Sequence, residues 1–158
     1  SDLSETKQAI ASATNPRGVS GGIGEALDGA DAFIGVSGGT IDEAHLARMA
    51  DDAIIFALSN PTPEVAPDVA TKYATVVATG RSDFPNQVNN VVAFPGIFPG
   101  ALEGRATQIT EEMKLAAATA ITGLVDDSEL NENNIMPQPF DPRVSDVVSN
   151  AVKANIRK

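Results

Sequence analysis

Four side-chain amides are crowded into the stretch TGRSDFPNQVNNVVAFPGIF, residues 79–98. They belong to Asn86, Gln87, Asn89 and Asn90, which directly precede an apolar segment. Each amide offers a hydrogen-bond donor and an acceptor without adding charge, and an ordinary turn needs only about one or two such residues. We therefore expect this segment to bind a polar ligand. The open alternative is that the amides serve as turn and helix-capping residues.

The strands expected to position these side chains are three short apolar runs, at residues 32–36, 53–58 and 75–78. The runs are continuous rather than alternating, which is typical of strands buried on both faces of a parallel sheet. Helices are expected between them, from a capping box at 40–43 to about residue 50, and over 67–73. The pattern predicts an α/β fold with a βαβαβ unit of parallel strands.

Further helices are expected outside this unit. One covers residues 4–13, and a longer amphipathic one covers 110–121. The segment 89–104 is apolar and is expected to be partly helical, interrupted at Pro95-Gly96. A last helix is expected to begin at Asp141-Pro142, an N-cap residue followed by proline at the first helical position.

Ligands of an open parallel sheet bind at the carboxyl ends of its strands. The sequence places Ser37, Gly38 and Gly39 after the first apolar run, Asn60 after the second and the amide cluster after the third. Small residues in the first loop allow the backbone to approach a flat ligand closely, and Asn60 supplies both a donor and an acceptor. We expect the three loops to form one neutral hydrogen-bonding rim.

Composition excludes several classes of partner. The net charge of -10 and the pI near 4.4 oppose binding to nucleic acids or anionic membranes, which is driven by clustered Lys and Arg. The chain has no cysteine and one histidine, so thiolate metal sites are excluded and a histidine cage is not expected. No signal peptide or long apolar span is recognisable, which predicts a cytoplasmic location.

Two other features favour a structural role, and a third, Arg81, has two possible roles. The glycine-rich segment 18–24 does not follow a buried strand, as a dinucleotide or triphosphate loop must, so we interpret it as a turn before a helix. His45 is expected on a solvated helix surface. Arg81 could hold a carboxylate or pair with Asp83.

Several segments resemble malic enzyme, specifically the compact bacterial type. The most specific are IFALSNPTPE at 55–64, ATGRSDFPNQVNN at 78–90 and AFPGIF at 93–98. Stretches at 14–22, 111–117 and 139–143 resemble the family in the same order. The resemblance extends over almost the whole chain.

This resemblance implies part of an oxidoreductase that oxidises malate to pyruvate and carbon dioxide with NAD or NADP and a divalent metal, Mg²⁺ or Mn²⁺. It implies that Asn60, Asn89 and Asn90 bind the substrate. The same comparison assigns cofactor binding to Ser37, Gly38, Gly39, Asn60 and Asn89. It also implies a homo-oligomer.

Only the last part of the family's pattern can be matched. The family's upstream catalytic tyrosine and lysine, its acidic metal ligands and its Gly-x-Gly-x-x-Gly turn have no counterpart here, and the only tyrosine, Tyr73, follows a short predicted helix. We therefore expect residues 1–158 to be the carboxyl-terminal part of the NAD(P)-binding domain, a partial Rossmann-like sheet lacking its first half. We expect no catalytic residue or metal ligand in this chain, no activity without the amino-terminal half, and an exposed apolar edge at 32–36.

Two other functions remain open on the sequence. A malolactic enzyme, which converts malate to lactate with the cofactor retained, shares these residues. A non-catalytic nucleotide-binding module would keep the polar rim without the chemistry. The choice between NAD and NADP depends on a residue that follows the missing second strand.

Overall fold

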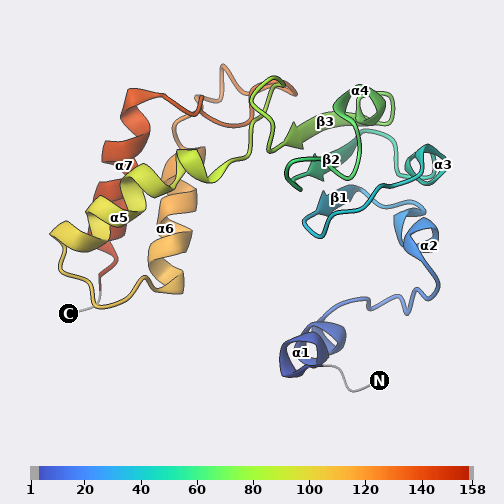
Figure 1. Ribbon diagram of the computed structural model, residues 1–158, viewed down its shortest axis with the longest axis horizontal. Helices are drawn as coiled ribbons and strands as arrows, with labels where there is room; N and C mark the ends of the chain where they lie inside the picture. Colours follow the sequence, from blue (N-terminus) through green and yellow to red (C-terminus); the bar gives the residue numbers. More distant parts are fainter. Residues whose placement is uncertain (1–3, 157–158) are drawn as a thin grey trace.

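A computed structural model describes residues 4–156 and places a small sheet beside a group of packed helices (Figure 1). We refer to residues 23–79 as the sheet unit and to residues 90–154 as the helical unit. The elements are, in chain order, α1 (Glu5–Ala13), α2 (Ile23–Leu27), β1 (Ala32–Gly35), α3 (Glu43–Leu46), β2 (Ala53–Ala57), α4 (Pro67–Ala70), β3 (Ala74–Thr79), the 3-10 helix η1 (Asn90–Val92), α5 (Phe94–Glu103), α6 (Glu111–Thr122) and α7 (Pro142–Ala154).

The sheet has three parallel strands in the order β1-β2-β3. Phe33 pairs with Ile55, and Ile55 pairs with Val77, so the three carboxyl ends lie at the same edge. The helices α3 and α4 connect successive strands. The predicted α/β class and the three parallel strands are therefore confirmed.

Only one face of the sheet is covered by helices within residues 4–156. Ile55 and Ala57 pack there with Leu27 of α2, Leu46 of α3 and Ala70 of α4. No helix of residues 4–156 covers the other face. The strand side chains that point toward it are less buried than their neighbours, and Ile34 is 62% exposed. The expectation that the strands are buried on both faces is wrong for this chain. The predicted exposed edge at β1 is confirmed by its position in the sheet.

The connecting helices are shorter than the sequence predicted. The N-cap of α3 is Asp42, whose Oδ1 accepts a hydrogen bond from the Ala44 N–H at 2.9 Å, so the expected capping box at 40–43 does not form. The helix then ends at Leu46, and α4 ends at Ala70. Short helices suffice here because each has only to bury one or two apolar residues against the sheet.

The helical unit has its own core, formed mainly by Val92, Met113, Ala117, Val148 and Val152. The helices α5 and α7 approach each other closely at two glycines of α5. A Cβ atom added to Gly96 would lie 2.4 Å from the Cβ of Val148, and one added to Gly100 would lie 2.7 Å from the carbonyl oxygen of Ser149. Glycine is therefore required at both positions by packing.

The expected interruption at Pro95-Gly96 does not occur, because α5 runs continuously through both residues. Pro95 stands in its first turn, where a missing N–H costs nothing. Pro99, inside the helix, cannot donate to the carbonyl of Pro95. That carbonyl accepts a hydrogen bond from the Ser145 hydroxyl of α7 at 3.0 Å instead.

One buried asparagine ties the two units together. The Nδ2 of Asn86 donates to the carbonyls of Val77 at 3.0 Å and Glu132 at 2.7 Å, and its Oδ1 accepts from the Ile135 N–H at 3.0 Å. Its φ of 55° is in the left-handed region, which asparagine tolerates better than most residues. Strand β3 and the loop before α7 are thus held by a single side chain.

The helix α1 buries none of its residues and lies apart from the sheet in Figure 1. The helices of the described chain are all too short or too polar to cross a membrane.

Candidate functional site

The loop after β1 presents bare backbone at the carboxyl edge of the sheet. Gly38 and Gly39 have φ angles of 76° and 92°, which glycine adopts readily. No described heavy atom would lie within 4 Å of a Cβ atom added to either residue. The structure therefore leaves open space beside the backbone of this loop.

Glu64, which the sequence analysis did not single out, holds this loop. The residue is buried, and its Oε1 accepts hydrogen bonds from the N–H groups of Ser37 and Gly38, each at 3.2 Å, and from the Ser59 hydroxyl. Its Oε2 accepts from the Ser59 N–H at 3.3 Å. The carboxylate therefore joins the loops that follow β1 and β2. A glutamate that directly follows the Pro-Thr-Pro turn after a strand was the available signal.

The hydrogen bonds keep the Glu64 carboxylate charged. Burial by itself would raise the pKa of Glu64, but the hydrogen bonds from the Ser59 hydroxyl and from backbone N–H groups outweigh it, and the pKa lies below the ordinary glutamate value. Donors are the groups that stabilise a buried carboxylate in the absence of a cation. Glu64 is thus a fixed negative charge whose oxygens already have partners.

Asn60 lies across the edge from the loop after β3. Its side chain packs against Gly80, where an added Cβ atom would be 2.9 Å from Nδ2 and 3.0 Å from Oδ1. Among residues 4–156 the Asn60 amide has no hydrogen-bond partner, and the residue is exposed. The amide is therefore available to a ligand.

The two predicted asparagines that follow β3 have different surroundings. The Oδ1 of Asn89 accepts a hydrogen bond from the Val91 N–H at 3.1 Å and caps η1, while its Nδ2 lies 3.4 Å from the carbonyl oxygen of Gly80. The side chain of Asn90 is exposed and has no partner within the described residues. Asn60 and Asn89 thus meet at Gly80, and Asn89 also has the capping role that was its structural alternative.

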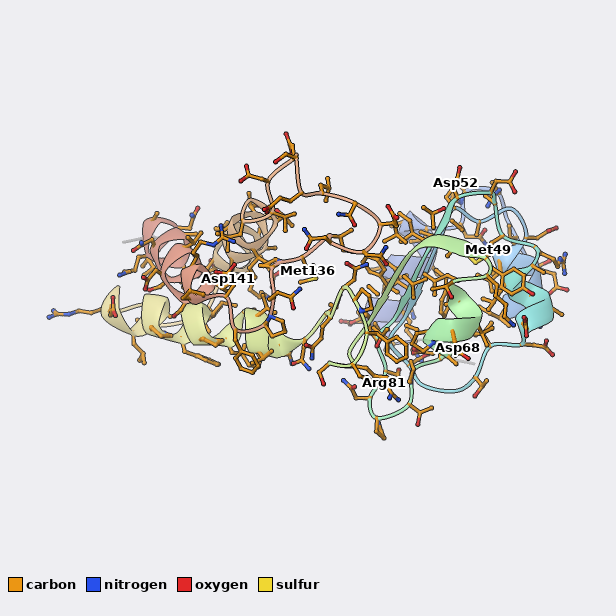
Figure 2. The ribbon with its side chains drawn as sticks, turned by 90° about the horizontal axis from the view of Figure 1, so that it is seen from above. Met49, Asp52, Asp68, Arg81, Met136 and Asp141 are labelled. Carbon is orange, nitrogen blue, oxygen red and sulfur yellow. The ribbon has the colours of Figure 1, made fainter. Side chains whose placement is uncertain are left out.

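Other members of the amide cluster and its neighbours are structural. The hydrogen bonds of Asn86 connect the sheet unit to the helical unit, so its amide is occupied and does not face a ligand. Arg81 pairs with Asp83, with distances of 2.9 Å between Nε and Oδ1 and 2.6 Å between Nη2 and Oδ2. Figure 2 shows Arg81 on the loop that follows β3. The hydrogen bond from Arg81 lowers the pKa of the Asp83 carboxyl. Of the two roles considered for Arg81, pairing with Asp83 is the one found.

The glycine-rich segment before α2 also has a structural role. It does not follow a strand and leads directly into the helix, as expected. Gly24 is buried against the imidazole of His45, where an added Cβ atom would lie 2.6 Å from Nδ1. His45 is therefore half-buried between α2 and α3, rather than fully solvated as predicted.

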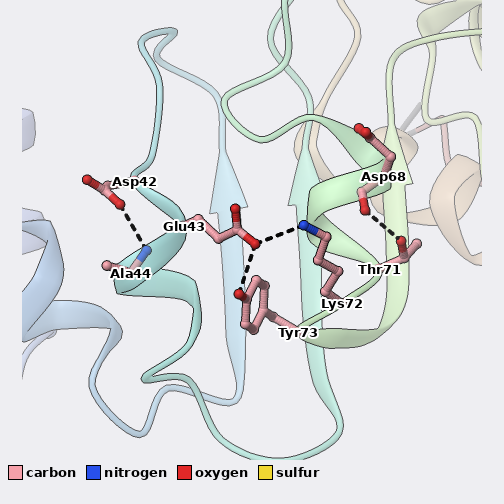
Figure 3. Close-up of polar contacts among 7 residues, drawn as sticks. All are labelled: Asp42, Glu43, Ala44, Asp68, Thr71, Lys72 and Tyr73. Carbon is pink, nitrogen blue, oxygen red and sulfur yellow. Dashed lines mark hydrogen bonds and ion pairs between the residues drawn. The ribbon is translucent and has the colours of Figure 1, made fainter.

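Tyr73 and Lys72 lie just before β3 begins, so they are remote from the carboxyl ends of the strands. Both side chains donate to Oε1 of Glu43, at 2.9 Å from the hydroxyl and 3.0 Å from the ammonium group (Figure 3). These hydrogen bonds raise the pKa values of both donors. Neither side chain is positioned to exchange a proton with a ligand at the site.

The residues present fit a cofactor better than a metal ion. The Gly38 carbonyl, the Gly39 backbone and the Asn60 amide have no hydrogen-bond partner among residues 4–156, and they offer hydrogen bonds suited to a ribose or a carboxamide. Within residues 4–156, no three His, Asp or Glu side chains gather as metal ligands do. Among residues 4–156, no side chain of this edge belongs to such a group.

Comparison with known proteins gives the same family from sequence and from structure. The chain is 51% identical to an NAD-dependent malic enzyme of Geobacillus stearothermophilus, with 92% of this chain and 30% of that protein covered. It is 50% identical to a bifunctional malic/malolactic enzyme of Bacillus subtilis, with 95% and 37% covered. The crystal structure of an NAD-dependent malic enzyme from Thermotoga maritima superimposes with a TM-score of 0.87 at 46% identity, with 96% and 40% covered.

These relatives are much longer than the chain, which spans less than half the length of each. The model of the malic enzyme NAD binding domain matches residues 28–156, which include the whole sheet and the helical unit. The chain therefore belongs to the malic enzyme family, as part of its NAD-binding domain.

Proposed function

We propose that this chain supplies the nicotinamide and malate end of the active site of an NAD- or NADP-dependent malic enzyme, which oxidises malate to pyruvate and carbon dioxide. The observation that carries this proposal is the Asn60 amide, which has no protein partner among residues 4–156 and faces Gly80 at the carboxyl edge of the sheet. The side chain is positioned by its contact with Gly80, while its amide groups form no hydrogen bond within the described residues and are available to a ligand.

The proposed roles follow from what each group can donate or accept. Asn60 contacts both the nicotinamide ribose and malate, because one amide can donate to a carboxylate and accept from a hydroxyl. Ser37, Gly38 and Gly39 lie along the cofactor, which supplies the hydride acceptor when bound. Asn90 orients malate, while Asn89 contacts both ligands from its capping position. Neutral amides suit these tasks because they do not compete for the proton that leaves the malate hydroxyl.

The family relationship also favours a second activity. The relative from Bacillus subtilis is named as a bifunctional malic/malolactic enzyme. The same rim could retain the cofactor while pyruvate is reduced to lactate, since both activities need malate and nicotinamide side by side. We therefore propose malolactic activity as the alternative. A non-catalytic module accounts less well for membership of this family.

We also propose that other parts of the longer enzyme contact this chain. The exposed face and the free edge of β1, where Ile34 is 62% exposed, suit cover by another part of the longer enzyme. We infer that this part is its amino-terminal half, which also brings the acid/base groups and the Mg²⁺ or Mn²⁺ ligands. Homo-oligomerisation and a cytoplasmic location remain predictions from the sequence.

The test uses the full-length enzyme that contains this segment, supplied with malate, Mn²⁺ and either NAD or NADP. Reduced cofactor and pyruvate should appear in equal amounts, together with carbon dioxide. Lactate without free reduced cofactor would support the malolactic alternative. An enzyme that binds the cofactor but turns over no malate would contradict both activities. The isolated chain, residues 1–158, is the control and should reduce no cofactor.

A further inference from the structure

Glu64 is the most completely enclosed carboxylate in the described chain. The residue is 2% exposed, and no ion pair within residues 4–156 neutralises it. Its two oxygens instead accept four hydrogen bonds from Ser37, Gly38 and Ser59, three of them from backbone N–H groups. Burying a charged carboxylate costs free energy unless hydrogen-bond donors replace the lost water. The loops after β1 and β2 must therefore keep their donors in place around Glu64.

The same residue also fixes the far end of the first loop. Its backbone carbonyl accepts a hydrogen bond from the Ile41 N–H at 2.9 Å, while its side chain holds Ser37 and Gly38. Residues 37–40, with two consecutive glycines in the left-handed region, would otherwise be free to adopt many conformations. Glu64 therefore holds this loop from both sides.

The sheet makes room for the carboxylate at Gly35, the last residue of β1. A Cβ atom added to Gly35 would lie 2.5 Å from Cδ of Glu64 and 2.7 Å from Oε2. Ser59 completes the enclosure, because its hydroxyl donates to Glu64 and accepts from the Gly38 N–H at 2.8 Å. Gly35, at the end of β1, and Ser59, in the loop after β2, thus both lie against the Glu64 carboxylate.

We propose that Glu64 is a positioning residue, which joins the loop of Ser37, Gly38 and Gly39 to the loop that carries Asn60 and thereby sets the cofactor-binding edge. This inference rests on the proposed function. Glu64 does not contact the cofactor, because its oxygens are occupied by the loop donors. It acts by holding the first loop and Asn60 at a fixed separation, which preorganises the edge before the cofactor arrives.

All four hydrogen bonds to the Glu64 side chain come from donors, so both of its oxygens must act as acceptors. Glutamine at position 64 has nearly the same size, but its amide nitrogen is a donor and would face N–H groups. Glu64→Gln should therefore release part of one loop without creating a cavity. With the amide oxygen in the position of Oε1, the amide nitrogen takes the position of Oε2, where it faces the Ser59 N–H and cannot accept its hydrogen bond. The substitution also removes the negative charge that strengthens the hydrogen bonds from Ser37, Gly38 and the Ser59 hydroxyl.

The experiment measures the dissociation constant of NAD and NADP by calorimetry on the full-length enzyme without malate. Glu64→Gln should weaken cofactor binding about ten- to a hundredfold, because hydrogen bonds to a charged group are lost. Glu43→Gln is the matched control, since it also removes a carboxylate of the sheet unit with two side-chain donors. The control should leave the dissociation constant within about twofold of wild type.

If Glu64→Gln does not fold, a second variant, Ser59→Ala, tests the positioning role. Ser59→Ala removes the hydroxyl that links Glu64 to Gly38, and it should weaken cofactor binding about three- to tenfold. If both single variants fold, their effects on cofactor affinity should be non-additive in a double-mutant cycle, because Ser59 and Glu64 are in direct contact.

The outcomes separate the inference from the function on which it rests. Cofactor affinity unchanged in the folded Glu64→Gln enzyme, or in Ser59→Ala, overturns the positioning role while leaving malate oxidation intact as a proposal. A wild-type enzyme that binds NAD or NADP and loses affinity on Glu64→Gln, but oxidises no malate, supports the positioning role and overturns the proposed reaction.

Discussion

The Asn60 side chain occupies the space that a Cβ atom on Gly80 would need, with its Nδ2 2.9 Å from that position. A residue at the end of β2 and a residue at the end of β3 are therefore fitted to each other. The backbone carbonyl of Gly80 in turn lies 3.4 Å from Nδ2 of Asn89. Gly80 therefore lies against both Asn60 and Asn89.

Gly80→Ala should move the Asn60 amide without unfolding the protein, because the contact is with the end of a side chain rather than with the backbone. We expect kcat/KM for malate to fall about tenfold or more in the full-length enzyme, with little change in Tm. Gly123→Ala is the control, since Gly123 has a φ of -71° and an added Cβ would lie 3.4 Å from its nearest neighbour. Unchanged turnover in Gly80→Ala would show that Asn60 has no role at its observed position.

Asn89→Ala and Asn90→Ala should differ in stability although both lower malate turnover. Asn89→Ala removes the cap on the Val91 N–H and should cost about 0.5 to 2 kcal/mol of unfolding free energy. Asn90→Ala removes an exposed amide and should leave stability nearly unchanged. Urea unfolding and malate kinetics on the same preparations separate the two effects, and Asn90→Asp should be worse than Asn90→Ala because it repels the anionic substrate. Equal stability of the two alanine variants contradicts the assignment of Asn89 as a cap.

Asn86→Asp should loosen the junction between the sheet unit and the helical unit. It replaces the amide nitrogen that donates to Val77 and Glu132 by a carboxylate oxygen facing two carbonyls. Leaving these buried groups unpaired should cost about 2 to 4 kcal/mol. The control is Asn150→Asp, on the exposed surface of α7. If thermal unfolding gives the same Tm for both variants, the junction is held by other contacts.

The fold was more predictable from the sequence than the site. The apolar runs predicted three parallel strands because side-chain burial is encoded locally, and Asp141 and Thr110 marked helix starts correctly for the same reason. The cover on each sheet face depends on segments distant in sequence, so burial on both faces was predicted wrongly. Likewise, an asparagine looks alike in sequence whether it caps, as Asn89 does, or stands free, as Asn60 does. Glu64 was missed because three of its four donors are backbone N–H groups, which no residue type reveals.

Glu64 should make stability depend on acid. Its pKa in the folded protein lies below the ordinary value of about 4.3, which the unfolded chain regains. Its contribution is fully present above that value and is lost as the pH falls through the lower folded-state pKa, because the unfolded state binds the proton first. The difference in unfolding free energy between wild type and Glu64→Gln should therefore shrink below about pH 4.3. Asp83 and Asp141, whose pKa values are also lowered, are present in both proteins and cancel. A difference that stays constant from neutral to acid pH would mean that the pKa of Glu64 is the same in the folded and unfolded states.

The most direct test of the central claim is the kinetic effect of Asn60→Ala in the full-length enzyme, measured beside Asn150→Ala, which removes an exposed amide on α7. If Asn60 binds malate and the nicotinamide ribose, kcat/KM for malate falls about ten- to a hundredfold, as expected for a lost hydrogen bond to a charged group, while Tm stays close to that of wild type. Asn150→Ala changes neither quantity. Wild-type kcat/KM in a folded Asn60→Ala enzyme would contradict the assignment of this edge of the sheet as the malate and cofactor site.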